Sequence, residues 1–139
     1  MSTLAAHRHD LVCALQRCGI VTEYSAHVAV SARGADSCSR MCQDLASLCR
    51  TTAELLTHRS AFEHGMLLVC VLAAEDCARE CEQHLGGFFA DCARACRDLS
   101  ETASEFSGDT FDCWFDFPRG RVPMGPGWHA EPSATEYHS

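Results

Sequence analysis

Lysine is absent from this chain of 139 residues, and all eleven of its basic residues are arginines. Against 19 acidic residues they leave a formal net charge of −8, whereas proteins that bind nucleic acid or anionic membranes usually carry a basic surface. No apolar run approaches the roughly 20 residues of a membrane-spanning helix. The first residues also lack the basic start and the apolar stretch of a secretory signal. These absences favour a cytoplasmic protein that binds neither nucleic acid nor a membrane.

Several motifs of enzymes and metal-binding domains are missing as well. The chain has no Cys-x2-Cys knuckle of the kind that zinc fingers place on their turns. No histidine follows a glutamate by three residues, as the carboxylate-bridged iron sites of helical bundles require. A glycine-rich phosphate loop and a Gly-x-Ser-x-Gly elbow are also absent. A catalytic pair of cysteine and histidine stays open, because residues that are distant in sequence can meet in the fold.

Cysteine is abundant instead, with eleven residues in the chain. Their number is odd and no export signal precedes them, so we expect free thiols that bind a metal in a reducing compartment. Eight of them lie between residues 38 and 96 in three segments. At about 100° per residue, their spacing places the thiols of each segment on one narrow stripe of a helix. The three stripes hold, in order, Cys38, Cys42 and Cys49; Cys70, Cys77 and Cys81; and Cys92 and Cys96.

The stripes also agree with one another in height. Two antiparallel helices joined by a short loop bring residues to the same height when their numbers add to a constant. The cysteines of the second and third helices obey this rule in the pairs 38/81, 42/77 and 49/70, and those of the third and fourth in 81/92 and 77/96. The implied loops fall near Ser60 and near Gly86-Gly87, where turn residues stand. We therefore expect all eight thiols to point into the core of a helical bundle.

The hydrophobic pattern predicts four helices, over residues 4–32, 37–58, 61–85 and 88–105, with Ser107-Gly108-Asp109 ending the last one. We thus expect an all-α fold, in which residues 1–105 form an antiparallel four-helix bundle with a cysteine-lined core. Residues 106–139 contain all four prolines and most of the aromatic residues. We expect them to form an irregular extension that packs on the bundle or on a neighbouring subunit.

Thiolates are soft ligands that select Cu(I), zinc or iron–sulfur clusters, and two or three of them complete a Cu(I) site. The predicted heights give three layers of three sulfurs. The layers are Cys38 with Cys81 and Cys92, Cys42 with Cys77 and Cys96, and, on an assumed first loop, Cys18 with Cys49 and Cys70. Met66 and His84 lie one turn beyond the ends of the Cys70 stripe and are further candidate donors. A polar residue at a helix end is an equal explanation for His84.

Two plainer explanations exist for the cysteines. Free cysteine is a common core residue that packs as a small hydrophobe. Cysteines at one height on neighbouring helices also form disulfides where the compartment is oxidising. The agreement of heights across three helices favours metal binding over both, with copper ions, as Cu(I), the expected partner and zinc a second candidate.

Three stretches carry a resemblance to a known family: residues 49–56 (CRTTAELL), 76–84 (DCARECEQH) and 91–97 (DCARACR). They resemble the cysteine-rich four-helix-bundle copper storage proteins over about residues 36–100. The resemblance implies a bundle core of thiolates that holds many Cu(I) ions. For the cytosolic branch, which this chain resembles most, it also implies a homo-oligomer, either a dimer or a tetramer.

The chain departs from the family pattern at several positions. Leu45, Leu67, Ala74 and Phe88 or Phe89 stand where further cysteines are usual, and residues 106–139 extend the chain beyond the fourth helix. A reduced copper capacity is therefore expected. The alternative is a family scaffold adapted as a copper- or thiol-dependent enzyme, with one small metal site and the extension as its lid. The number of Cu(I) ions per chain discriminates between the two.

Overall fold

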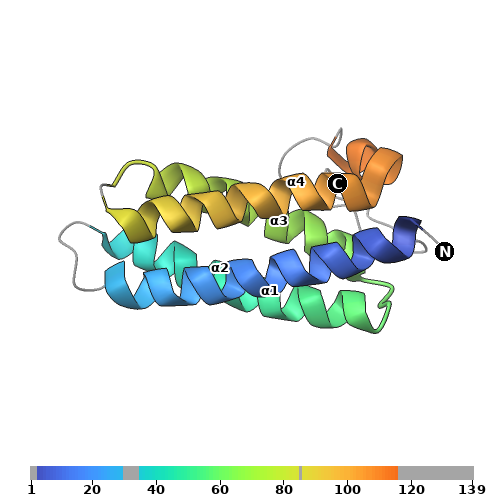
Figure 1. Cartoon of the computed structure of the whole chain (residues 1–139), viewed down its shortest axis with the longest axis horizontal. Coiled ribbons are helices and arrows are strands. Elements are labelled where there is room, and N and C mark those ends of the chain that lie inside the picture. The colour runs from blue at the N-terminus through green and yellow to red at the C-terminus, as the bar shows by residue number, and fades with distance from the viewer. Residues whose placement is uncertain (1–2, 30–34, 85, 116–139) are drawn as a thin grey trace, which may run out of the picture.

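Four helices make up the described part of the chain in this computed structural model (Figure 1). The structure describes residues 3–29, 35–84 and 86–115, with side chains over 6–29, 35–84 and 86–106. The helices are α1 (Thr3–Ala29), α2 (Asp36–Thr57), α3 (Glu63–Cys81) and α4 (Gly87–Phe115). Strands do not occur in these residues, and none of the described helices combines the length and apolar character that crossing a membrane needs. The predicted all-α, four-helix fold is confirmed.

Each helix packs against two of the others, because α1 and α3 both contact α2 and α4. α1 therefore lies diagonally opposite α3, and α2 lies diagonally opposite α4. Contacts between neighbours run in opposite order along the chain: Arg8 near the start of α1 meets Leu56 near the end of α2, whereas Ala26 near the end of α1 meets Ser39 near the start of α2. An antiparallel bundle requires this order, and Figure 1 shows the four helices lying alongside one another.

The observed helix ends differ from the predicted ones at two places. α3 ends at Cys81, before the predicted limit, and the chain turns toward Gly86, whose φ of 135° favours glycine. α4 continues through Ser107-Gly108-Asp109 to Phe115, so the predicted stop is wrong. Each of these residues costs at most about 1 kcal/mol in a helix interior, and the first proline to block the helix is Pro118. The extension after residue 115 lies outside the described residues.

The turn between α2 and α3 forms near Ser60, where the sequence predicts it. The amide of Ser60 donates a hydrogen bond to the carbonyl of Leu55 at 2.9 Å, and the amide of Arg59 donates one to the carbonyl of Leu56 at 3.3 Å. This pair of bonds closes a helix end around one left-handed residue. Arg59 is that residue, with a φ of 57°. A left-handed arginine costs roughly 1–2 kcal/mol, which a glycine would avoid.

The core changes character along the bundle axis. Cysteines fill the half that contains the start of α2 and the end of α3, with Leu45 and Ala74 buried among them. Leucines fill the other half, and the fully buried ones there include Leu11, Leu56 and Leu67. Leu45, Leu67 and Ala74, where the resemblance implies further cysteines, are therefore core residues, and the buried thiols occupy only part of the bundle.

Candidate metal centre

Nine cysteines lie buried inside the bundle, and none of the ten described cysteines forms a disulfide. The nine are the eight that the sequence places in the core, together with Cys18 of α1, and each is at most 1% exposed. The prediction that these eight thiols point into the core is confirmed. Cys13 is partly buried, and the side chain of Cys113 lies outside the described residues.

Three thiol pairs join α2 to α3. The Sγ–Sγ distances are 3.4 Å for Cys38 and Cys81, 3.6 Å for Cys42 and Cys77, and 3.8 Å for Cys49 and Cys70. These are the three pairs that the rule of constant sums predicts, because α2 and α3 run in opposite directions from a turn near Ser60. The register of this hairpin is therefore confirmed.

Four thiols gather more closely than the predicted layers suggest. The Sγ atoms of Cys42, Cys77, Cys81 and Cys92 all lie within 4.8 Å of one another, and we call this group the four-thiol cluster. The sequence placed Cys42 and Cys77 in one layer and Cys81 and Cys92 in the next. The structure merges the two, because the 3.6 Å contact between Cys42 and Cys92 crosses the bundle diagonally from α2 to α4.

Cys18 extends the sulfur contacts to α1. The neighbouring thiols of Cys49 and Cys96 lower its pKa, and Cys49 in turn contacts Cys70, so the three members of the predicted third layer are neighbours. The thiols of Cys18 and then Cys77 raise the pKa of Cys96, so Cys96 is a neighbour of both this layer and the four-thiol cluster. Cys38 contacts the cluster from the other side. The nine buried thiols thus form one series of neighbouring sulfurs, which we call the thiol ladder.

The spacing of the ladder suits a soft metal ion. With metal–sulfur bonds of about 2.3 Å, two sulfurs on one ion lie about 3.8 Å apart in tetrahedral geometry and about 4.0 Å apart in trigonal geometry. Five Sγ–Sγ pairs of the ladder lie between 3.4 and 4.0 Å apart. Neighbouring thiolates can therefore share an ion without separation of the helices.

Residues 3–108 match the sequence profile of the copper storage protein family. The chain belongs to that family. No curated protein and no solved structure matches the chain. All nine cysteines of the ladder lie within the matched residues, which makes the ladder the candidate copper site of this copper storage protein.

Hydrogen bonding and burial distribute the protons of the ladder unevenly. Hydrogen bonds from Cys49 and Cys96 lower the pKa of Cys18 to about 5. Hydrogen bonds from four neighbouring thiols, Cys42 first, lower the pKa of Cys92 as well. The pKa values of Cys49 and Cys96 are raised, first by hydrogen bonding to Cys18 and further by burial. In this copper storage protein, negative charge is therefore favoured at Cys18 and Cys92, where protonated neighbours stabilise it.

The two further candidate donors lie outside the ladder. The imidazole of His84 is half-buried and stacks on the ring of Phe89 with 4.8 Å between centroids, and its Nε2 lies 3.5 Å from the carboxylate of Glu80. Met66 is half-buried in the first turn of α3. The contacts of His84 are thus with an aromatic ring and a carboxylate, and metal binding by either residue stays a prediction.

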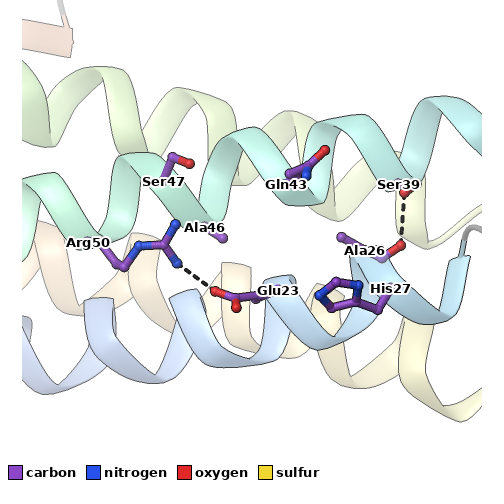
Figure 2. A pocket seen from close by; sticks show the side chains of 8 residues that line it. All are labelled: Glu23, Ala26, His27, Ser39, Gln43, Ala46, Ser47 and Arg50. Carbon is purple, nitrogen blue, oxygen red and sulfur yellow. Dashed lines mark hydrogen bonds and ion pairs between the residues drawn. The ribbon is translucent and has the colours of Figure 1, made fainter.

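A groove lies on the outer face of α1 and α2. Glu23, Ala26 and His27 line it from α1, and α2 contributes small and polar residues together with Arg50. Figure 2 shows Arg50 reaching across the groove to Glu23, and the Oγ of Ser39 donates a hydrogen bond to the carbonyl of Ala26 at 2.9 Å. Cysteine is absent from the described residues that line this groove.

Sequence reasoning missed three sulfur neighbours, of which the diagonal contact between Cys42 and Cys92 is one. The second is the proximity of Cys18 to Cys96, which could be predicted from their heights only with the knowledge that the first and last helices are neighbours. The Sγ of Cys13 lies 3.7 Å from the Nε2 of His9 on the outer side of α1. The spacing of four residues on one helix is a signal that could have revealed this third contact.

Proposed function

We propose that this copper storage protein sequesters Cu(I) inside the thiol ladder. The observation that carries the proposal is the gathering of nine buried, free thiols inside one bundle, where they offer several adjacent soft sites. Burial keeps water and oxidants away from the bound ions. Each ion can exchange between neighbouring sulfurs that are already in contact.

Charge balance supports a capacity close to one ion per ladder thiol. Each Cu(I) replaces one thiol proton, so the charge of the core is unchanged when ions and thiolates are equal in number. A larger excess of thiolate would leave buried negative charge without a counterion, since the buried polar residues of the described chain include no arginine or histidine. We therefore propose up to nine Cu(I) ions per chain.

An anaerobic titration with a competing Cu(I) chelator tests the proposal. We expect each chain to bind several Cu(I) ions, at most about nine. Each bound ion should release further protons, which the buffer takes up. Binding of a single ion, or of none, would contradict storage and would favour the enzyme on a family scaffold. Saturation with the same number of ions in the presence of excess Zn²⁺ would show that Cu(I) is the preferred cargo.

Zinc is a second candidate at one part of the ladder. The four-thiol cluster provides the four sulfurs of a tetrahedral zinc site, whereas Cys18, Cys49 and Cys70 provide only three. We expect the copper-free protein to bind one Zn²⁺ per chain. We expect Cu(I) to displace this zinc ion. Four bound thiolates around one Zn²⁺ leave two negative charges in the core, which favours Cu(I) over zinc.

Two features of the biological setting are also proposed. Free thiols support a cytoplasmic location, because a reducing compartment preserves them. Ile20 and Tyr24, which are 71% and 63% exposed on the outer face of α1, support assembly into a dimer or tetramer. Light scattering of the purified chain tests the assembly, with Ile20→Glu expected to shift it toward the monomer.

A further inference from the structure

Cys38 and Cys81 form the closest sulfur contact of the ladder, at 3.4 Å, and both lie at helix ends. We propose that these two thiols form a reversible disulfide when the copper-free protein meets a peroxide, and that the bond withdraws two ligands from the ladder. The effect on capacity rests on the proposed storage of Cu(I). The formation of the disulfide does not.

The position of the pair in the bundle singles it out from the other thiols. A disulfide bond is about 2.05 Å long, so the two sulfurs must approach by roughly 1.3 Å. Cys38 lies in the first turn of α2, which begins at Asp36, and Cys81 is the last residue of α3. Terminal turns open and shift at low free-energy cost. Cys49 and Cys70 start farther apart, at 3.8 Å, and lie inside their helices, where the same movement would bend both.

The chemistry needs only the peroxide as oxidant. One thiolate attacks a peroxide oxygen, the O–O bond breaks, and a sulfenic acid and water form once a proton is taken up. The second thiol then attacks the sulfenic sulfur, the S–O bond breaks, and a second water leaves with the proton of that thiol. In sum, two thiols and one hydrogen peroxide give one disulfide and two waters. A dithiol reductant reverses the change by thiol–disulfide exchange.

The burial of Cys38 and Cys81 and their bonding to copper determine how fast, and in which state of the protein, peroxide oxidises them. Both thiols are at most 1% exposed, so peroxide reaches them when the terminal turns open. The reaction is therefore slower than at an exposed thiol. Thiolates that hold Cu(I) are engaged in metal bonds, so the loaded protein is protected.

The bond changes one part of the ladder and leaves the rest intact. Cys81 belongs to the four-thiol cluster, and its loss leaves the other three members of that cluster in contact. Among the described thiols, Cys38 contacts only Cys42 and Cys81, so its loss breaks no connection between the others. Capacity should therefore fall by about two ions, and sulfurs from Cys42 to Cys70 should continue to bind Cu(I).

Peptide mapping tests the bond itself. The apo chain is reduced, freed of reductant, treated with hydrogen peroxide, blocked with N-ethylmaleimide and digested without reduction. We expect the first crosslinked peptide pair to join Cys38 to Cys81, and prior loading with Cu(I) to suppress it. A different first pair, or a sulfinic acid at one cysteine without any crosslink, would overturn the proposal.

Capacity measurements test the consequence, with Cys49→Ser as the matched control. Peroxide should lower the Cu(I) capacity of the wild type and of Cys49→Ser by two ions each, and dithiothreitol should restore it. Cys38→Ser should show no such reversible loss. If the reduced wild type binds no Cu(I), the storage function fails while the mapping still decides on the disulfide. If the crosslink forms without loss of capacity, the regulatory part is wrong.

Discussion

The carboxylate of Glu63 accepts two hydrogen bonds from the guanidinium of Arg8, at 2.8 and 3.1 Å, at the leucine-filled end of the bundle. Arg8 also donates to the carbonyl of Leu56 at 2.9 Å and lies over the ring of Phe106, 5.2 Å from its centroid. These contacts join all four helices at one point. The Glu63 side chain is only 8% exposed, so the pair closes this end of the bundle against water.

Breaking this pair should destabilise the protein without changing its copper capacity. Glu63→Gln leaves the partly buried Arg8 charge without its counterion, and we expect a loss of about 3 kcal/mol in the free energy of unfolding. Urea denaturation of the reduced apo protein measures it. Glu23→Gln is the matched control, because the pair of Glu23 with Arg50 is more than half exposed and should contribute less than about 1 kcal/mol. A change in Cu(I) stoichiometry in Glu63→Gln would show that this end takes part in binding.

Loss of a ladder thiol should lower the number of bound Cu(I) ions, and loss of an outer thiol should not. Cys70 contacts the ladder only through Cys49, so Cys70→Ser should remove at least one ion by chelator competition. Cys13→Ser is the matched control, since its thiol is partly exposed beside His9. We expect Cys113→Ser to leave the stoichiometry unchanged as well. Unaltered binding in Cys70→Ser, combined with loss in Cys113→Ser, would place the metal site in the C-terminal extension.

The ionisation of Cys18 should make stability depend on pH. Its pKa is about 5 in the folded chain, against 9.0 as the ordinary value. Between these values the unfolded chain binds a proton that the folded chain does not, so this group favours folding more as the pH rises and loses its effect as the pH falls toward 5. Wild type should therefore lose more stability between pH 8 and pH 5 than Cys18→Ser does.

Urea denaturation of the reduced apo proteins at the two pH values measures the difference. Cys13→Ser should behave like the wild type, because its thiol does not belong to the ladder. Thiolate ultraviolet absorbance gives a second readout, and part of it should disappear near pH 5 in the wild type but not in Cys18→Ser. Equal pH dependence of the three proteins would mean that Cys18 is protonated in the folded chain.

Replacing Arg59 with glycine should stabilise the fold. The left-handed φ of 57° at Arg59 closes the end of α2, and glycine adopts this conformation without the steric cost that arginine meets. We expect Arg59→Gly to raise the free energy of unfolding by about 0.5–1 kcal/mol, less than the full strain because glycine is also freer in the unfolded chain. Thermal unfolding checks the change, and Cu(I) stoichiometry should stay the same. Destabilisation would show that the arginine side chain contributes a favourable contact.

The sequence by itself determined the helices and the heights of the thiols. Helical periodicity places Cys38, Cys42 and Cys49 on one stripe, and a short turn near Ser60 then sets each of them level with its partner on α3. Both are local properties, because they depend on the rise per residue and on a turn of known length. The buried position of these pairs could therefore be predicted from residue numbers alone.

Only the tertiary structure decided which layers touch. The diagonal contact between Cys42 and Cys92, and the proximity of Cys18 to Cys96, depend on the distances between helix axes and on side-chain directions, which residue numbers do not contain. The end of α4 was missed for a different reason. Weak local stop signals at Ser107-Gly108-Asp109 cost little in a long helix, so the chain stays helical until Phe115. Local periodicity thus determined where each thiol stands along the bundle, and packing among helices distant in sequence decided which sulfurs can share an ion.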